Sequence, residues 1–302
     1  MTHDLTFKTS MSFDYGVPAP VSPGVVRLVA NNPSPLTFKG TNTYLVGMTE
    51  LAVIDPGPAD DAHRAAILKA AAGRPIRQIV VTHAHRDHVD GAVALKDATG
   101  ATIYGYGREE IAAAGPAIQP QGSEFIDYVF APDVRVDHHD IIEGPEWALE
   151  AIHTPGHAPD HLCFALVGRN ILFSGDHVMA WNTTLVAPPE GHMGDYVASL
   201  QILLARREAL YLPGHGDRLD EPQRAVRAYL LHRRWREEQV LDAIRGGRGS
   251  VDAIVPVVYP TIDDKLVRAA ALSVQAHVEH LIARGLVTCD GDQTLSGSLA
   301  PA

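Results

Sequence analysis

One short run of ligand-type side chains constrains this chain more than any other feature. Residues 83–88, HAHRDH, contain three histidines and one aspartate within six positions. They directly follow the apolar, β-branched run 78–82, which predicts a buried strand. Neutral imidazole and carboxylate are the groups that zinc and related divalent metals prefer as ligands. The run therefore predicts a metal site on a loop at the end of a strand.

Three later segments repeat this arrangement of a predicted strand, a glycine and a ligand-type residue. His157 ends the TPGH motif that follows a predicted strand at 147–153. Asp176 ends the SGD motif after the apolar run 171–173, and His215 ends the PGH motif after the run 209–212. Glycine allows the backbone to turn tightly close to a metal. We therefore expect these side chains to join those of residues 83–88.

The remaining pattern predicts a layered α/β domain followed by a helical tail. Strand and helix signals alternate up to about residue 220, which is typical of an α/β fold. Residues 17–37 are rich in proline and small polar residues, and we expect them to be irregular. Helices are predicted at 222–245, 251–259 and 263–283, followed by a strand signal at 285–289. This order is typical of a winged helix, so we divide the chain into domains 1–221 and 222–302.

These motifs, in this order, resemble the metallo-β-lactamase superfamily. Within it, the chain is most similar to the β-lactamase-like protein 2 group, in the segment GTNTYLVG at 40–47, in the Asp-Pro-Gly at 55–57 and in the tail at 231–241. The resemblance covers nearly the whole chain. It implies a four-layer αββα sandwich with a small C-terminal winged-helix-like domain.

The resemblance also assigns the ligands of two divalent metal ions. It implies that the first ion is bound by His83, His85 and His157, and the second by Asp87, His88 and His215, with Asp176 as the bridging ligand. Asp87 and Asp176 are also the residues to which we assign catalytic roles. Zinc is the expected metal, with manganese or iron as alternatives.

Other histidines lie near these motifs and are expected to have other roles. The superfamily's ligand is the histidine after the glycine, so His153 is expected at the end of its strand, outside the site. His161 and His177 are expected to support the ligands or line the pocket. His138 and His139 lie among charged residues and are expected to be solvated.

The resemblance implies a binuclear hydrolase that uses a metal-bound hydroxide. A thioester, lactone or other ester is the first substrate class. A single-strand-specific endoribonuclease is the alternative, because the group includes such enzymes. A metal-binding regulator with a DNA-reading winged helix is a third hypothesis, and it is the weakest because seven ligands exceed what a DNA reader needs.

Charge favours a small-molecule substrate over single-stranded RNA. The net charge of the chain is −11, whereas nucleic-acid-binding modules usually present a basic face. Residues 222–302 are nearly neutral, with ten Lys and Arg against nine Asp and Glu. The cluster Arg233-Arg-Trp-Arg236 could form a small basic face, but we expect its arginines to cap the interface between the domains. The sequence allows a homodimer and does not decide whether the chain forms one.

The chain carries no sequence signal for secretion or membrane insertion. Its first residues are polar and charged where a signal peptide would be apolar, and no apolar run approaches ~20 residues. Cys163 and Cys289 are 126 positions apart and in no ligand pattern, so we expect them to be unpaired. We therefore expect a cytoplasmic enzyme.

Overall fold

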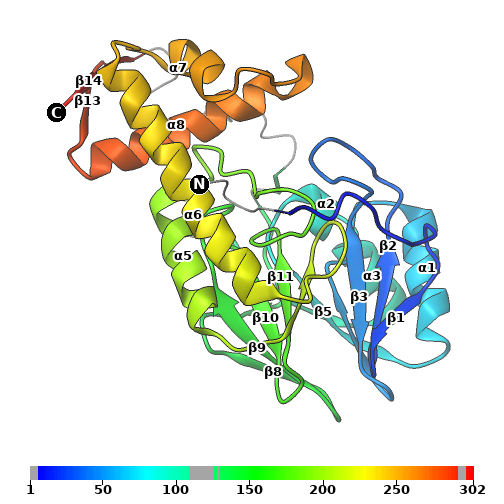
Figure 1. Ribbon diagram of the computed structural model, residues 1–302. Coiled ribbons are helices and arrows are strands. Elements are labelled where there is room, and N and C mark those ends of the chain that lie inside the picture. Colours follow the sequence, from blue (N-terminus) through cyan, green and yellow to red (C-terminus); the bar gives the residue numbers. More distant parts are fainter. Residues whose placement is uncertain (1–5, 109–125, 128, 292–296) are drawn as a thin grey trace.

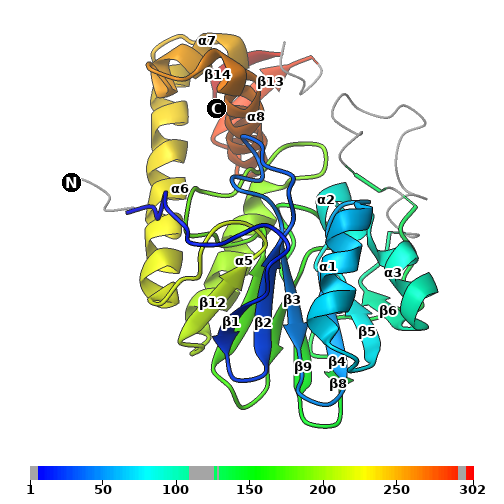
Figure 2. The ribbon, with the colours of Figure 1, turned by 90° about the vertical axis from the view of Figure 1, so that its right-hand side faces the viewer.

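Two β-sheets packed face to face form the centre of the molecule (Figures 1 and 2). The computed structural model describes residues 6–108, 126–127, 129–291 and 297–302. The first sheet has its strands in chain order, with antiparallel pairs up to β4 and parallel pairs from β4 to β7. These strands are β1 Ala19–Ser22, β2 Val25–Val29, β3 Asn42–Val46, β4 Leu51–Ile54, β5 Ile76–Val80, β6 Thr102–Gly105 and β7 Val134–Arg135.

The second sheet has the order β12-β11-β10-β9-β8. Its strands are β8 Ile141–Glu143, β9 Ala148–His153, β10 Leu162–Leu166, β11 Ile171–Gly175 and β12 Leu210–Pro213. The β11–β12 pair is parallel and the other pairs are antiparallel. Strands β9, β11 and β12 therefore run in one direction, and their carboxyl ends lie at one edge of the sheet.

Helices cover the outer face of each sheet, which completes four layers (Figure 2). On the first sheet lie α1 Asp61–Ala71 and α3 Ala92–Thr99, preceded by the short α2 Arg86–Val89. On the second sheet lie α5 Met193–Ala205 and the first half of α6 Pro222–Arg245. The predicted α/β sandwich is confirmed. Among the described residues, no helix combines the length and apolar character needed to cross a membrane.

Side-chain alternation along the strands explains why both faces of each sheet are buried. In β3, Tyr44 and Val46 point between the sheets, where the Tyr44 ring lies 5.2 Å from that of Phe173. Leu45 points the other way and belongs to the core that includes Ile67 of α1. Successive strand residues face opposite sides, so a strand between two layers is apolar on both faces at most of its positions. This is why the strands appear in the sequence as continuous apolar runs.

The C-terminal residues form a small helical unit with its own core, at the top of Figure 1. It contains the second half of α6, α7 Val251–Val258, α8 Val267–Ala283 and the hairpin β13 Val287–Asp290 with β14 Ser298–Pro301. The predicted helical, winged-helix-like region is confirmed. The division at 221/222 stays a prediction, because α6 contributes side chains to the cores on both sides of it.

The prediction that residues 17–37 are irregular is wrong for part of that range. Ala19–Ser22 and Val25–Val29 form β1 and β2. Proline is tolerated in β1 because it is an edge strand, which needs hydrogen bonds on one side only. In β2, the buried Arg27 forms an ion pair with Asp217, at 3.2 Å, which allows a charged residue inside an otherwise apolar strand.

The start of α1 buries a histidine beneath the loop that follows β4. The Asp60 side chain caps the helix by accepting a hydrogen bond from the Ala62 amide at 2.8 Å. His63, only 3% exposed, donates from Nε2 to the Thr43 hydroxyl at 2.8 Å, since that hydroxyl already donates to the Asp55 carbonyl. Burial lowers the pKa of His63 to about 4, although Asp60 acts in the opposite direction.

This histidine should make the protein sensitive to acid. The pKa of His63 is lower in the folded state than its ordinary value of 6.5. Its contribution to stability is therefore complete above about pH 7 and is lost as the pH falls towards 4, by up to about 3 kcal/mol. We expect His63→Gln, measured by urea unfolding, to be less stable than the wild type at pH 8 and to approach it at pH 4.5. A difference that does not vary with pH would contradict the assignment.

Candidate metal centre

The predicted ligands all follow carboxyl ends of strands that meet at one edge of the sandwich. His83, His85, Asp87 and His88 follow β5, whereas His157, Asp176 and His215 follow β9, β11 and β12. Hydrogen bonds between the sheets hold this edge together. The amide of Asn42 in β3 donates to the Gly214 carbonyl at 2.7 Å, and that of Leu162 in β10 donates to the Thr82 carbonyl at 2.8 Å.

The structure brings all seven predicted ligands together in three overlapping groups. Within each group the candidate ligand atoms lie within 4.8 Å of one another. The groups are His83, His85 and His157; His83, His88 and Asp176; and Asp87, His88 and His215. The clusters are consistent with a binuclear metal site. Two of the groups contain the same residues as the two sets that the resemblance implies, and their assignment as ligands stays a prediction.

Asp176 occupies the position between the two ligand sets. Its Oδ2 lies 3.7 Å from Nε2 of His157 and 3.3 Å from Nε2 of His215. Its Oδ1 lies 3.5 Å from Nε2 of His88. A carboxylate so placed can reach both sets, which is what the predicted bridging role requires. That role, and the catalytic role assigned to Asp176 and Asp87, stay predictions.

Part of the ligand run is helical, whereas the sequence predicted a loop. His85 is the N-cap residue of α2, and Asp87 and His88 lie within its single turn. The His88 and Val89 amides both donate to the His85 carbonyl, at 2.9 and 3.0 Å. This turn folds the later ligands back towards His83, which is how six consecutive residues can serve both groups.

Backbone carbonyls fix the tautomers of two of the histidines. Nδ1 of His157 donates to the Leu185 carbonyl at 2.7 Å, and Nδ1 of His215 donates to the Gly40 carbonyl at 3.2 Å. A carbonyl can only accept, so in the neutral ring the proton lies on Nδ1 and the lone pair of Nε2 faces the cluster. Such partners orient the ring of a metal ligand.

Asp55 orients two of the histidines that follow β5, His88 directly and His83 through Thr82. The sequence analysis did not assign this role to Asp55. Its Oδ2 accepts from the Thr82 hydroxyl at 2.8 Å and lies 2.9 Å from Nδ1 of His88. Because the Thr82 hydroxyl donates to Asp55, it accepts from Nδ1 of His83 at 2.9 Å. From the sequence pattern, Asp-Pro-Gly at 55–57 indicated only the end of a strand. A histidine that binds metal through one ring nitrogen usually donates a hydrogen bond from the other, so a partner for His88 could be expected. That rule does not say which carboxylate in the sequence is the partner.

The other nearby histidines lie where the sequence predicted. His153 ends β9, donates to the Pro159 carbonyl at 2.9 Å and stacks on Tyr106, outside the three groups. The buried His161 accepts the Asp176 amide on Nε2 at 3.1 Å, so it supports a ligand. His177 is buried against the ring of Tyr196. His138 and His139 are exposed.

The electrostatics of the cluster suit metal binding. Burial lowers the pKa of His83 and of His85 well below the usual range, which leaves neutral imidazoles. Burial also acts to raise the pKa of Asp176, but His215 and His88 outweigh it, so the carboxylate stays ionised. Metal ligands must be deprotonated, and the shifts of His83, His85 and Asp176 favour that form. Burial also acts to lower the pKa of His88, but Asp87, Asp176 and Asp55 raise it well above its usual range. Burial lowers the pKa of His215 as well, but Asp176 and Asp87 raise it to about 9, so this ring must lose a proton when a metal binds.

Two further observations show that the residues fit a metal. The buried Oδ1 of Asp176 has no hydrogen-bond partner among the described residues, which is costly unless a cation compensates it. In addition, a Cβ on Gly214 would lie 2.5 Å from that oxygen and 2.6 Å from Cε1 of His88. Position 214 thus leaves no room for a side chain beside the cluster.

Comparison with known proteins agrees with this geometry. The family model described as metallo-beta-lactamase superfamily matches residues 36–215, which is more than half of the chain. The chain belongs to the metallo-beta-lactamase superfamily. A second model, described as beta-lactamase associated winged helix domain, matches residues 250–295 within the C-terminal unit.

Individual relatives extend the match over most of the chain. A beta-lactamase-like protein 2 homolog of Drosophila melanogaster is 30% identical over 86% of this chain and 88% of its own. An atrochrysone carboxyl ACP thioesterase of Paecilomyces divaricatus is also 30% identical, over 83% and 77% of the two chains. A beta-lactamase domain protein from Burkholderia ambifaria shares the fold, with a TM-score of 0.82, 22% identity and coverage of 99% and 98%.

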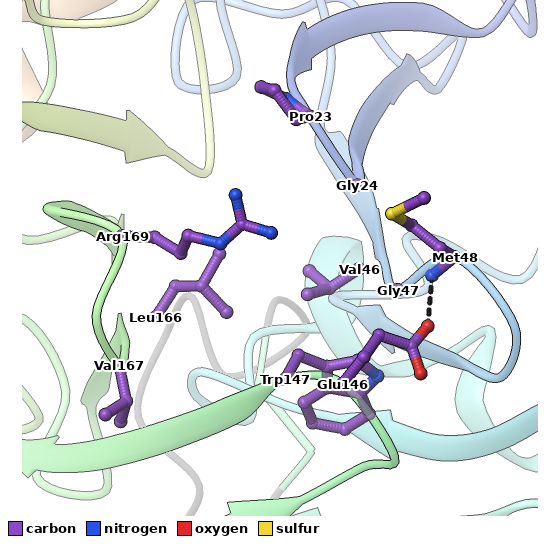
Figure 3. Close-up of a pocket in the computed structure, with 10 residues that line it drawn as sticks. All are labelled: Pro23, Gly24, Val46, Gly47, Met48, Glu146, Trp147, Leu166, Val167 and Arg169. Carbon is purple, nitrogen blue, oxygen red and sulfur yellow. Dashed lines mark hydrogen bonds between the residues drawn. The ribbon is translucent and has the colours of Figure 1, made fainter.

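A hollow lies at the opposite end of the strands from the candidate metal centre (Figure 3). It is formed by the turns that precede β2, β4, β9 and β11, with Gly24, Met48, Trp147 and Arg169 among its lining residues. Glu146 closes one side by accepting hydrogen bonds from the amides of Met48 and Thr49. Since β4 and β11 run from this end towards Asp55 and Asp176, the hollow is separate from the metal centre.

Proposed function

We propose that this protein is a binuclear metal-dependent hydrolase that cleaves a thioester, lactone or other ester bond in a small molecule. The observation that carries the proposal is the convergence of seven ligand-type side chains in three overlapping groups. Zinc is the ion that we propose, and manganese and iron are the alternatives for the same nitrogen and oxygen ligands.

The candidate ligands differ in burial, and this suggests different roles for them in the proposed reaction. Bound divalent ions would supply an activated water at neutral pH and a positive charge for the oxygen on which charge develops. His83, His88 and His215 are buried, so they form the floor. The half-buried His85, Asp87 and His157 form the side that substrate can approach. The Thr41 hydroxyl donates to Asp87 at 3.3 Å and holds this carboxylate towards the cluster.

A side-chain nucleophile is not needed for this chemistry, and the nearest serine is already engaged. Ser174, in the SGD motif, is buried, and its hydroxyl donates to the Val178 carbonyl at 2.9 Å. Its role is to fix the turn that carries Asp176, which agrees with water as the nucleophile in the proposed reaction.

Charge and burial support a small molecule over single-stranded RNA. Of the three arginines in the cluster that could have formed a basic face, Arg233 and Arg236 are buried, at 3% and 9% exposure, and Arg234 is exposed. Arg233 donates to the Thr184 carbonyl of the first unit, whereas Arg236 donates to the Val258 carbonyl within the C-terminal unit. Residues 1–221 carry the remaining fifteen basic and twenty-seven acidic residues, an excess of negative charge that repels a polyanion.

A thioester is the substrate class that we place first. One of the relatives named above is a thioesterase by its printed name, and it covers most of this chain. A thiolate is a good leaving group that needs no strong acid. This agrees with a centre whose described acidic side chains, Asp87 and Asp176, have pKa values held well below the usual range.

A substrate panel tests the proposal. We expect protein that contains close to two equivalents of zinc to hydrolyse an S-acyl thioester, to act more slowly on a lactone and to leave single-stranded RNA intact. Removal of metal with a chelator should abolish the activity, and added zinc or manganese should restore it. Cleavage of RNA without thioester or lactone hydrolysis would overturn the substrate class. Failure to bind metal at all would overturn the whole proposal.

A further inference from the structure

The long helix α6 belongs to two cores at once. In its first half, Val226 and Tyr229 are buried in the core between α5 and the second sheet. In its second half, Val240 and Ile244 are buried in the core of the C-terminal unit. Figure 1 shows this helix, in yellow, running from the outer face of the second sheet up to α7 and α8. Its 24 residues therefore connect the C-terminal unit rigidly to the catalytic one.

Two residues of α6, one turn apart, bind the loop that follows Asp176. The Tyr229 hydroxyl accepts the Met179 amide at 3.2 Å and lies within hydrogen-bond distance of the Met179 and Asn182 carbonyls. Arg233 donates through one of its terminal nitrogens to the Thr184 carbonyl. Residues at positions i and i+4 lie on the same face of a helix, so both contacts are made at once.

Thr184 carries the connection on to Asp176 itself. Its hydroxyl lies 2.8 Å from the carbonyls of Asp176 and His177, to which it donates. The Tyr196 hydroxyl donates to the same His177 carbonyl at 2.7 Å. Thr184 thus links Arg233 to the backbone of Asp176. Its carbonyl accepts a hydrogen bond from Arg233, and its hydroxyl donates one to the Asp176 carbonyl.

The environment of Arg233 shows that its charge is not used for an ordinary ion pair. The side chain is 3% exposed, and within the described ranges no carboxylate forms an ion pair with it. Its guanidinium lies over the ring of Tyr196, 5.0 Å from the centroid. Burying a cation without a counter-ion costs free energy that an apolar side chain of similar size avoids. The hydrogen bond to Thr184 is what distinguishes this arginine from such a side chain.

We propose that Arg233 is a positioning residue, which holds the carboxylate of Asp176 in place through Thr184. Because Arg233 is on α6, the C-terminal unit then influences the metal centre without touching it. The inference rests on the proposed function, since it assumes that Asp176 binds metal.

The test compares three variants with a matched control. Arg233→Met keeps the length of the side chain and removes its donors, Arg233→Lys keeps one charged donor, and Thr184→Val removes the next bond. Arg234→Met is the control, because Arg234 is the exposed neighbour on the same helix. The readouts are metal affinity by competition with a chelator, the visible spectrum of the cobalt-loaded protein, amide hydrogen exchange at 176–184 in the metal-free protein, and kcat and KM on a thioester.

We expect Arg233→Met to weaken metal binding by about 10- to 100-fold, the range typical when a ligand's supporting partner is removed. The cobalt spectrum should change, exchange at 176–184 should accelerate, and kcat should fall with KM nearly constant. Arg233→Lys should recover part of the loss. Thr184→Val should resemble Arg233→Met, and the double variant should lose less than the sum because both changes break one chain of contacts. Arg234→Met should behave as the wild type.

The proposal would be overturned if Arg233→Met bound metal with an affinity within twofold of the wild type and had the same cobalt spectrum, whatever the thermal stability of the variant. If Arg233→Met does not fold, Arg233→Lys and Thr184→Val provide the same comparison. The proposed function can fail separately. If the wild type hydrolyses no ester or thioester but the variants still alter the cobalt spectrum, the positioning role stands and the substrate class does not.

Discussion

Replacing His157 by alanine should remove metal and activity together, whereas replacing His153 should remove neither. Nε2 of His157 lies 3.0 Å from Nδ1 of His85 and 3.7 Å from Asp176, so its loss opens the first ligand set. His153 is outside all three groups and only stacks on Tyr106 and donates to the Pro159 carbonyl. The two residues share the HTPGH segment, so each variant is a control for the other.

The expected sizes follow from these contacts. A metal in such a site contributes several kcal/mol to transition-state stabilisation, so His157→Ala should lower kcat by about 100- to 10,000-fold and reduce the bound metal. His153→Ala should cost about 1–2 kcal/mol of stability for the lost stacking and hydrogen bond, with metal content unchanged. Elemental analysis and steady-state kinetics decide between them. The opposite pattern would mean that the strand end, rather than the residue after the glycine, supplies the ligand.

Asp55→Asn should damage the metal centre although Asp55 is not itself a ligand. Both carboxylate oxygens of Asp55 accept hydrogen bonds, from the Thr82 amide, the Thr82 hydroxyl and His88. An asparagine has the same shape but must turn its amide hydrogens towards one of these donors. If they face Nδ1 of His88, the ring can relieve the conflict only by moving its proton to Nε2, which points into the cluster.

We therefore expect Asp55→Asn to weaken metal binding by about 10- to 100-fold and to cost about 1–3 kcal/mol of unfolding free energy. Chelator competition measures the first effect, and nitrogen-15 NMR of the histidine rings reports the tautomer of His88. Glu146→Gln is the matched control. That carboxylate also accepts backbone amides, but it lies at the opposite end of the strands. Equal metal affinity in the two variants would show that Asp55 has only a structural role.

The candidate ligands, which the structure brings together, could be picked out because their signals are local. Each lies within a few residues of a strand end, and a strand that is buried on both faces is visible as a short apolar run, such as 78–82 or 171–173. The winged-helix-like tail was predictable for a related reason, since helix periodicity and the glycines that end helices are also local features.

Features that depend on pairing between distant segments were not predictable from the residues alone. Strand β1 contains proline and is stable only because it lies at the edge of a sheet, and β2 contains an arginine whose partner, Asp217, is 190 positions away. Asp55 and His88 are 33 positions apart, and nothing between them signals their contact. In each case the deciding interaction joins two elements that are far apart in the sequence, and the local sequence pattern does not show that they lie side by side.

The sequence by itself was enough to pick out the seven candidate ligands, because each is a ligand-type residue close to the end of a strand signal and, after β9, β11 and β12, next to a glycine. Only the tertiary structure decided that Nε2 of His88, His157 and His215 faces the cluster, because the Nδ1 atoms of these rings bind the distant partners Asp55, Leu185 and Gly40. It also decided the environment of Arg233 and Arg236. From the sequence alone, Arg233 and Arg236 could have formed part of an exposed basic face, but the packing of α6 between two cores buries both of them.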